Sequence, residues 1–156
     1  MSNAMNYWLF KTEPDAFSID DLKTAPQKTT LWEGVRNYQA RNFMRDDIKL
    51  GDLVFIYHSS CKQVGVVGIA TVTKEAYPDP PQFDLNSDYY DAKATPDKPR
   101  WFVVDVTYKS HLNKRVSLKD IKANEAITEL ALKKAGRLSV MPVTQNDWEQ
   151  IIAMSN

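Results

Sequence analysis

The chain has 156 residues, 43% of them hydrophobic, which is enough for one domain with its own buried core. Lys and Arg together number 20, as do Asp and Glu, so the formal net charge is zero. This balance excludes a positive field over the whole molecule, and any contact with nucleic acid must come from a local group of side chains.

Cysteine and histidine are scarce. Cys61 is the only cysteine, and His58 and His111 are the only histidines, which excludes an internal disulfide and the usual Cys/His metal site. Strand alternation also directs His58 and Cys61 to opposite faces, which argues against a nucleophilic pair. The sequence has no phosphate-binding glycine loop either, so we expect no metal and no cofactor.

The N-terminal residues and the apolar segments indicate where in the cell the protein is expected. No apolar run approaches the roughly 18 residues of a membrane span, and no secretory signal pattern is visible. We therefore expect no membrane contact and a location in the cytoplasm, or in the nucleus of a eukaryote. Residues 1–4 precede a second methionine and have the pattern of an expression scar, so a single domain is expected over residues 5–156.

The first half of the chain predicts strands and short helices. YWLFK (7–11) is typical of a strand, and Ser18 with Asp21 forms a helix-start box for a helix that Pro26 ends. A second helix is expected from Val35 to about Asp46. LVFIYH (53–58) and VGVVGIATVT (64–73) then predict an antiparallel pair, in which Gly65 and Gly68 mark bulges or close backbone approach.

The second half begins with an irregular excursion. Residues 74–100 contain five prolines, and a segment of this length is uncommon in a compact domain unless it serves a site. The further expected elements are a strand at 101–108, a polar turn at 109–115, a helix starting at Ser117, helical spacing at 127–131, a strand at 138–143 and a helix starting at Thr144. The order predicts an α+β fold with a small curved or barrel-like sheet.

WEGVRNYQARNF (32–43) concentrates aromatic and hydrogen-bonding groups. On a helix over residues 36–48, Asn37 and Arg41 share an arc of about 100° with apolar residues. Trp32 offers a face on which a base can stack, and an Asn amide matches a base edge. Phosphate contacts are the predicted role of Arg36, Arg41 and Arg45. The alternative is that Trp32 is core, Asn37 caps or pairs internally, and the arginines are solvated.

Six segments resemble the EVE domain family, in the family's order and over nearly the whole chain: WLFKTEP (8–14), WEGVRNYQARNF (32–43), YHSSC (57–61), KEAYPD (74–79), PRWFVVDV (99–106) and RLSVMPV (137–143). The resemblance implies a PUA-like fold, which is a curved β-barrel with short surrounding helices, related to YTH and ASCH domains. It also implies a pocket for an extruded base, with modified cytosines in DNA or modified bases in RNA as ligands.

The resemblance also implies site residues. The base-binding residues would be Trp32, Asn37, Tyr38, His58, Ser59 and Trp101. The surrounding polar shell would be Lys11, Glu13, Arg137 and Ser139. Several alternatives stay open: His58 and Ser59 as structural residues, Trp101 facing core or cavity, and Tyr77, Tyr89 and Tyr90 as a lid or as loop packing.

A second basic cluster consists of Lys109, His111, Lys114 and Arg115, in which Lys109, Lys114 and Arg115 are candidate phosphate contacts. The alternative is a solvated hairpin tip. Together these features predict a non-catalytic module that binds a flipped, modified base such as a modified cytosine in DNA or RNA. An enzyme of nucleic-acid or nucleotide metabolism, or a small-molecule binder, using the same cavity, is the alternative.

Overall fold

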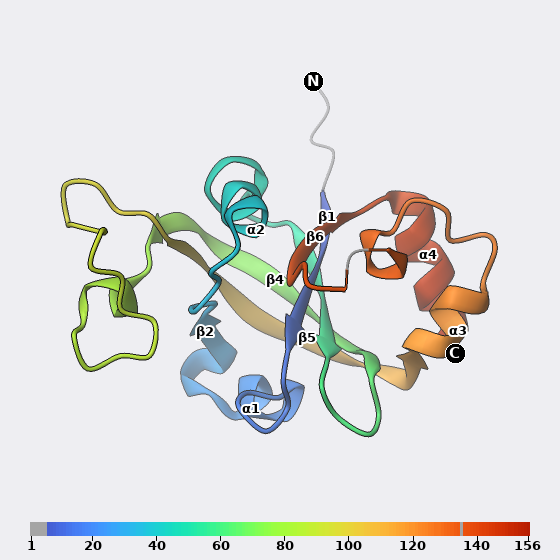
Figure 1. Ribbon diagram of the computed structural model, residues 1–156. Helices are drawn as coiled ribbons and strands as arrows, with labels where there is room; N and C mark the ends of the chain where they lie inside the picture. The colour runs from blue at the N-terminus through green and yellow to red at the C-terminus, as the bar shows by residue number, and fades with distance from the viewer. Residues whose placement is uncertain (1–5, 135) are drawn as a thin grey trace.

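The computed structural model describes residues 6–134 and 136–156. Six strands form one sheet in the order β2-β5-β4-β3-β1-β6, in which β1 and β3 are parallel and the other neighbours antiparallel (Figure 1). The strands are β1 Tyr7–Thr12, β2 Thr29–Leu31, β3 Leu53–His58, β4 Gly65–Pro78, β5 Phe102–Ser117 and β6 Val140–Val143.

The sheet is open. In the described residues, β2 and β6 are the two ends of the strand order, and they have only three and four residues. The expected α+β class with short helices is confirmed, but the expected closed barrel is wrong. Closure requires the first and last strands to bond to each other along a shared length. Here β2 pairs with β5 and β6 pairs with β1.

Bulges alter the register of the sheet, as the glycines predicted. The register of β3 with β4 shifts between Ile56 and Tyr57, and that of β4 with β5 shifts between Val66 and Gly68. A Cβ atom at Gly68 would lie 2.7 Å from the carbonyl oxygen of Ser110, so only glycine allows this close approach. Such bulges bend a strand and increase its twist.

Four α-helices surround the sheet: α1 Ile19–Thr24, α2 Tyr38–Asn42, α3 Leu118–Ala123 and α4 Gln145–Met154. The side chains of Ser18, Ser117 and Thr144 cap α1, α3 and α4, each accepting the backbone N–H of the residue three positions later. These three predicted helix starts are confirmed. None of the described helices has both the length and the apolar character needed to cross a membrane.

Three local expectations were wrong, and one strand was missed. The expected helix from Val35 begins only at Tyr38, and five residues later it becomes a π-helical turn, Phe43–Asp47. Residues 109–115 are not a turn but part of the long strand β5, whose exposed side chains account for their polarity. Residues 127–131 do not form a continuous helix, and a single 3-10 turn covers Ala131–Lys133. Strand β2 was not predicted at all.

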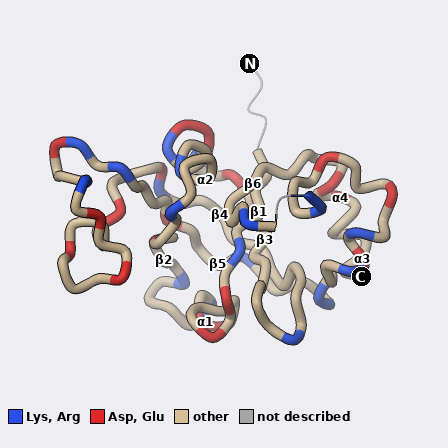
Figure 2. The backbone as a smooth tube through the Cα atoms, viewed as in Figure 1, with Lys and Arg blue, Asp and Glu red and all other residues tan. Residues whose placement is uncertain are grey.

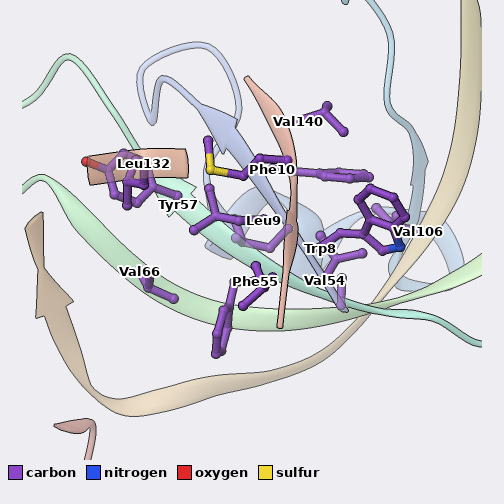
Figure 3. Close-up of a cluster of buried hydrophobic side chains, with 14 of the residues drawn as sticks. Trp8, Leu9, Phe10, Val54, Phe55, Tyr57, Val66, Val106, Leu132 and Val140 are labelled. Atoms are coloured by element: carbon purple, nitrogen blue, oxygen red, sulfur yellow. The ribbon is translucent and has the colours of Figure 1, made fainter. Parts of the chain in front are cut away.

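The core lies against the central strands. Figure 3 shows Trp8, Leu9 and Phe10 of β1 grouped with Val54 and Phe55 of β3, and all five are at most 3% exposed. Trp148 of α4 stacks on Phe55 with ring centroids 3.6 Å apart, so α4 closes one end of this core. Burial of these side chains supplies the main stabilisation of the fold.

Candidate nucleic-acid interface

A cavity of about 520 Å³ opens where the end of β1, strand β2 and the segment before β6 meet. Its size is within the range of about 300–1,000 Å³ typical of small-ligand sites. The predicted site residues that line it are Lys11, Glu13, Trp32, Ser59, Arg137 and Ser139. Side chains from four separate segments of the sequence therefore meet around one hollow.

Trp32 serves both the core and the cavity. It is 7% exposed, and its ring lies 5.3 Å from that of Phe10 and 6.3 Å, edge-on, from that of Phe17. Trp32 and Phe17 also line the cavity. The two interpretations of Trp32, as core residue and as stacking face, are thus compatible, because packing on one side fixes the indole that the cavity exposes.

The segment after Trp32 is held by backbone contacts. The Trp32 N–H donates to the carbonyl of Val104, and the Gly34 N–H donates to Oδ2 of Asp79 at 3.0 Å. Gly34 has φ +81°, a conformation that favours glycine. These two anchors place the residue between them, Glu33, on the cavity wall.

Tyr89 supplies a further wall from the proline-rich excursion. It lines the cavity, and its ring lies so close to Gly34 that a Cβ atom there would be 2.7 Å from the ring. Arg36 holds Tyr89 in two ways: it donates to the Tyr89 carbonyl at 2.8 Å, and its guanidinium lies 5.2 Å from the ring centroid. Of the lid candidates, Tyr89 is the one that lines the cavity.

Part of the predicted polar shell already forms hydrogen bonds within the protein. The Lys11 ammonium donates to the Gly136 carbonyl at 2.9 Å, and burial lowers the pKa of Lys11. The Lys11 and Ser59 backbone N–H groups donate to the carbonyls of Ser139 and Thr12. These bonds tie the rim loops to β1, so the rim is organised before any ligand arrives.

Glu33 is a cavity residue that the sequence analysis missed. Glu33 is an exposed residue, but its partial burial, and then the nearby Asp79 carboxylate, raise its pKa, whereas Arg36 opposes the rise. Asp79 itself is fully buried, and its Oδ1 has no hydrogen-bond partner in the described part of the chain. The only available sequence signal was the position of Glu33 beside Trp32.

Four predicted base-binding residues do not line this cavity. Tyr38 and Trp101 stack on each other with ring centroids 4.9 Å apart, and Trp101 Nε1 donates to Asp91 at 2.8 Å. Asn37 caps α2 by accepting the Ala40 N–H, and His58 Nε2 accepts the Ile19 N–H at 3.1 Å. The Tyr38–Trp101 stack is nevertheless adjacent, because Arg36 contacts both Tyr89 and Trp101.

The three α2-region arginines are engaged within the protein. Arg36 pairs with Asp79 at 3.1 Å, Arg41 donates to the Arg100 carbonyl, and Arg45 pairs with Asp46. The second basic cluster is more exposed: Lys109, Lys114 and Arg115 lie on β5, where Arg115 donates to the Val64 carbonyl. Figure 2 shows both charge signs distributed along the chain, without one large basic face in that view.

Within residues 6–134 and 136–156, no group of three or more His, Cys, Asp or Glu side chains is arranged to hold a metal ion. The polar groups of the cavity are hydroxyls, carboxylates, an ammonium and a guanidinium. Such groups, beside aromatic faces, are suited to recognising a flat polar heterocycle.

Comparison with known proteins agrees with this description. The chain is 42% identical to thymocyte nuclear protein 1 of Rattus norvegicus over 169 aligned positions, covering 97% of this chain and 74% of the relative. A structure of human THYN1 protein in complex with 5-methylcytosine-containing DNA superimposes with a TM-score of 0.93 at 38% identity, covering 97% of this chain and 98% of that chain. A Pseudomonas putida protein superimposes with a TM-score of 0.91 at 48% identity, covering 96% of this chain and 99% of that chain. The model of the EVE domain matches residues 6–154, and the chain therefore belongs to the EVE domain family.

Proposed function

We propose that this protein binds DNA and accepts one flipped, modified cytosine, 5-methylcytosine in the first instance, in the cavity beside Trp32. One observation carries the proposal: human THYN1, which has the same fold at 38% identity over nearly the whole chain, has a structure in complex with DNA that contains 5-methylcytosine. The aromatic and polar side chains that line the cavity support the proposal.

The energies are compatible with base flipping. Extruding a base from a duplex costs a few kcal/mol, and stacking on an aromatic face returns about 1–3 kcal/mol per base. Trp32, Phe17 and Tyr89 offer such faces around the hollow. Hydrogen bonds to the base edge must supply the remainder, and Ser59, Ser139, Lys11 and Arg137 are the polar groups in place.

Selection for a methyl group depends on fit. One methylene-sized group discriminates by about 1–3 kcal/mol, or roughly tenfold to a few hundredfold. Because Trp32 is fixed from behind by Phe10 and from the side by Phe17, the wall cannot easily retreat to accept different shapes. The fixed aromatic wall therefore favours a base whose shape matches it.

The remaining site predictions belong to the same proposal. Tyr38, Trp101 and Asn37 would contact the strand beside the flipped base rather than the base itself, since they lie next to the cavity. His58 would act through the fold, by holding α1. The proposal is of a binding module without catalysis, and RNA as a partner and a cytoplasmic or nuclear location stay predictions.

The test is a titration of duplexes that carry one central cytosine, 5-methylcytosine or 5-hydroxymethylcytosine, followed by fluorescence anisotropy. Wild-type protein should bind the methylated duplex about tenfold more tightly than the unmodified one. Ala16→Trp places a large ring in the cavity without removing a core residue, because Ala16 is exposed and lines the hollow, and it should abolish the preference.

The matched control is Ala126→Trp, which adds the same ring to another exposed turn outside the cavity lining and should leave the preference intact. Equal affinity of wild-type protein for all three duplexes would remove the proposal. Conversion of any duplex to a new product would replace it with the enzyme alternative.

A further inference from the structure

We infer that Glu33 identifies the base in the cavity as a cytosine. Its carboxyl group would form one hydrogen bond with N3 and one with the exocyclic amine, and the complex would hold one added proton between the carboxyl group and N3. This inference rests on the proposed function and adds a specificity-determining residue to it. It also makes DNA binding depend on pH.

The position of Glu33 is fixed on both sides. The preceding Trp32 N–H is bonded to Val104, and the following Gly34 N–H is bonded to buried Asp79. Glu33 lines the cavity directly beside the indole wall. A base stacked on Trp32 would therefore present its edge to a side chain attached to the adjacent residue.

The Glu33 carboxyl also has no partner among the described residues. Within the described residues, it takes part in no ion pair or side-chain hydrogen bond, although two cations line the same cavity. One of them, Lys11, donates to the Gly136 carbonyl instead. An exposed carboxyl group that has no internal partner and belongs to a cavity-lining residue is available to a ligand.

The hydrogen-bond patterns of the two groups match once a proton is added. Unpaired cytosine offers an amine donor at N4 and an acceptor at N3. A protonated carboxyl offers one donor and one acceptor, and a carboxylate facing N3-protonated cytosine gives the same pair of bonds. Thymine reverses the pattern, with a donor at N3 and an acceptor at O4, and a protonated carboxyl can exchange the roles of its two oxygens to match it. Thymine has no basic ring nitrogen, however, so only cytosine can take the shared proton at N3 and form the stronger, charge-assisted pair. Methylated cytosine and thymine share the methyl group, and Glu33 would separate them.

The charges around Glu33 favour proton uptake. Burial and the Asp79 carboxylate raise its pKa, and Arg36 partly offsets them. The other charged groups that line the cavity are Lys11, Glu13 and Arg137. Because the complex holds a proton that free Glu33 loses as pH rises, affinity should be constant at low pH. It should then fall by up to about tenfold per pH unit above the pKa of the free carboxyl.

The experiment measures binding between pH 5 and pH 8 with two duplexes, one containing 5-methylcytosine and one containing thymine, each base opposite an abasic site so that neither loses a pairing partner. Wild-type protein should prefer 5-methylcytosine by about tenfold, because only cytosine can take the shared proton at N3 and form a charge-assisted pair. Calorimetry in two buffers of different ionisation enthalpy should show proton uptake on binding.

The decisive variant is Glu33→Gln. Its amide has the donor and acceptor of a protonated carboxyl but does not titrate. It should bind 5-methylcytosine with affinity independent of pH, and lose most of the preference over thymine because the amide can turn over. Glu125→Gln is the matched control, since Glu125 is exposed and lies outside the cavity lining, and it should behave as wild type. In Glu13→Gln, which changes another carboxylate of the cavity, the pH slope should remain.

The outcomes separate the two proposals. If wild-type protein prefers methylated over unmodified cytosine but Glu33→Gln keeps the wild-type pH slope and thymine discrimination, Glu33 does not read the base, whereas the proposed function stands. If Glu13→Gln alone flattens the slope, the titrating group is Glu13 and the inference is wrong. If wild-type protein shows no preference for methylated cytosine at any pH, both proposals fail together.

Discussion

At the scale of single residues, the wall formed by Tyr89 depends on the absence of a side chain at position 34. The Gly34 Cα supports the Tyr89 ring, and Arg36 holds both the ring and the carbonyl of Tyr89 from the other side. Position 34 also requires φ +81°, which costs a residue with a Cβ atom about 1–2 kcal/mol. Two separate reasons therefore favour glycine here.

We expect Gly34→Ala to weaken binding of 5-methylcytosine DNA by about tenfold, because the new methyl group displaces Tyr89 from the cavity wall. Gly51→Ala separates the two causes. Gly51 has a similar φ of +89° but no atom within 4 Å of an added Cβ. Both variants should lose similar backbone stability in urea unfolding, and only Gly34→Ala should lose affinity. A comparable loss of binding in Gly51→Ala would assign the effect to backbone strain rather than to displacement of Tyr89.

At the scale of elements, α1 is attached to the sheet through its first turn. Ser18 caps the helix with a full capping box, and the Ile19 N–H donates to Nε2 of His58 at the end of β3. His58 must be neutral at Nε2 to accept this bond. Burial lowers the pKa of His58, His111 lowers it further, and Asp20 and Asp21 oppose the shift.

This attachment predicts an acid-sensitive fold. Because the folded pKa of His58 lies below the unfolded value of about 6.5, its contribution is fully present above that pH and is lost as pH falls through the folded pKa. The free energy of unfolding in urea should therefore decrease from pH 7.5 to pH 5. In His58→Gln, whose amide oxygen accepts without titrating, the decrease should be smaller. An identical decrease in both proteins would assign the acid sensitivity to other groups.

The elements also show which parts of the fold the sequence could predict. Helix starts were predictable because Ser18, Ser117 and Thr144 act on residues three positions away. The missed strand β2 has only three residues. It forms because its hydrogen-bond partners are in β5, 75 or so positions later in the sequence. The 109–115 segment appeared to be a turn because an exposed edge of a long strand has the composition of a loop.

The site was predictable to the extent that it depends on local chemistry. The cavity lining includes six residues that the family resemblance implied, and their contact with a base stays a prediction: Lys11, Glu13, Trp32, Ser59, Arg137 and Ser139. Asn37 and Tyr38 lie outside the cavity lining, because Asn37 caps a helix and Tyr38 stacks on Trp101. Glu33 and Tyr89 were not predicted as base-binding residues, since only the tertiary contacts of Gly34 place them at the cavity.

At the scale of the whole molecule, charge is balanced and dispersed. The formal net charge is zero, and the cavity itself contains both carboxylates and cations. Non-specific attraction to DNA should consequently be weak, and affinity should depend on salt only through a few local phosphate contacts. The exposed cations at 109, 114 and 115 on β5 are candidates for such contacts, because the arginines of the α2 region are engaged internally.

Lys114→Ala tests whether DNA extends from the cavity to β5. Loss of one phosphate contact should reduce the slope of log affinity against log salt by about 0.9, and should weaken methylated and unmodified duplexes equally, since a phosphate carries no base information. Lys49→Ala is the control: it removes an exposed lysine near the start of β1, whereas the cavity lies at the end of that strand. Anisotropy titrations at several salt concentrations measure both slopes. An unchanged slope for Lys114→Ala, with the cavity variants still defective, would confine the DNA to the cavity side of the sheet.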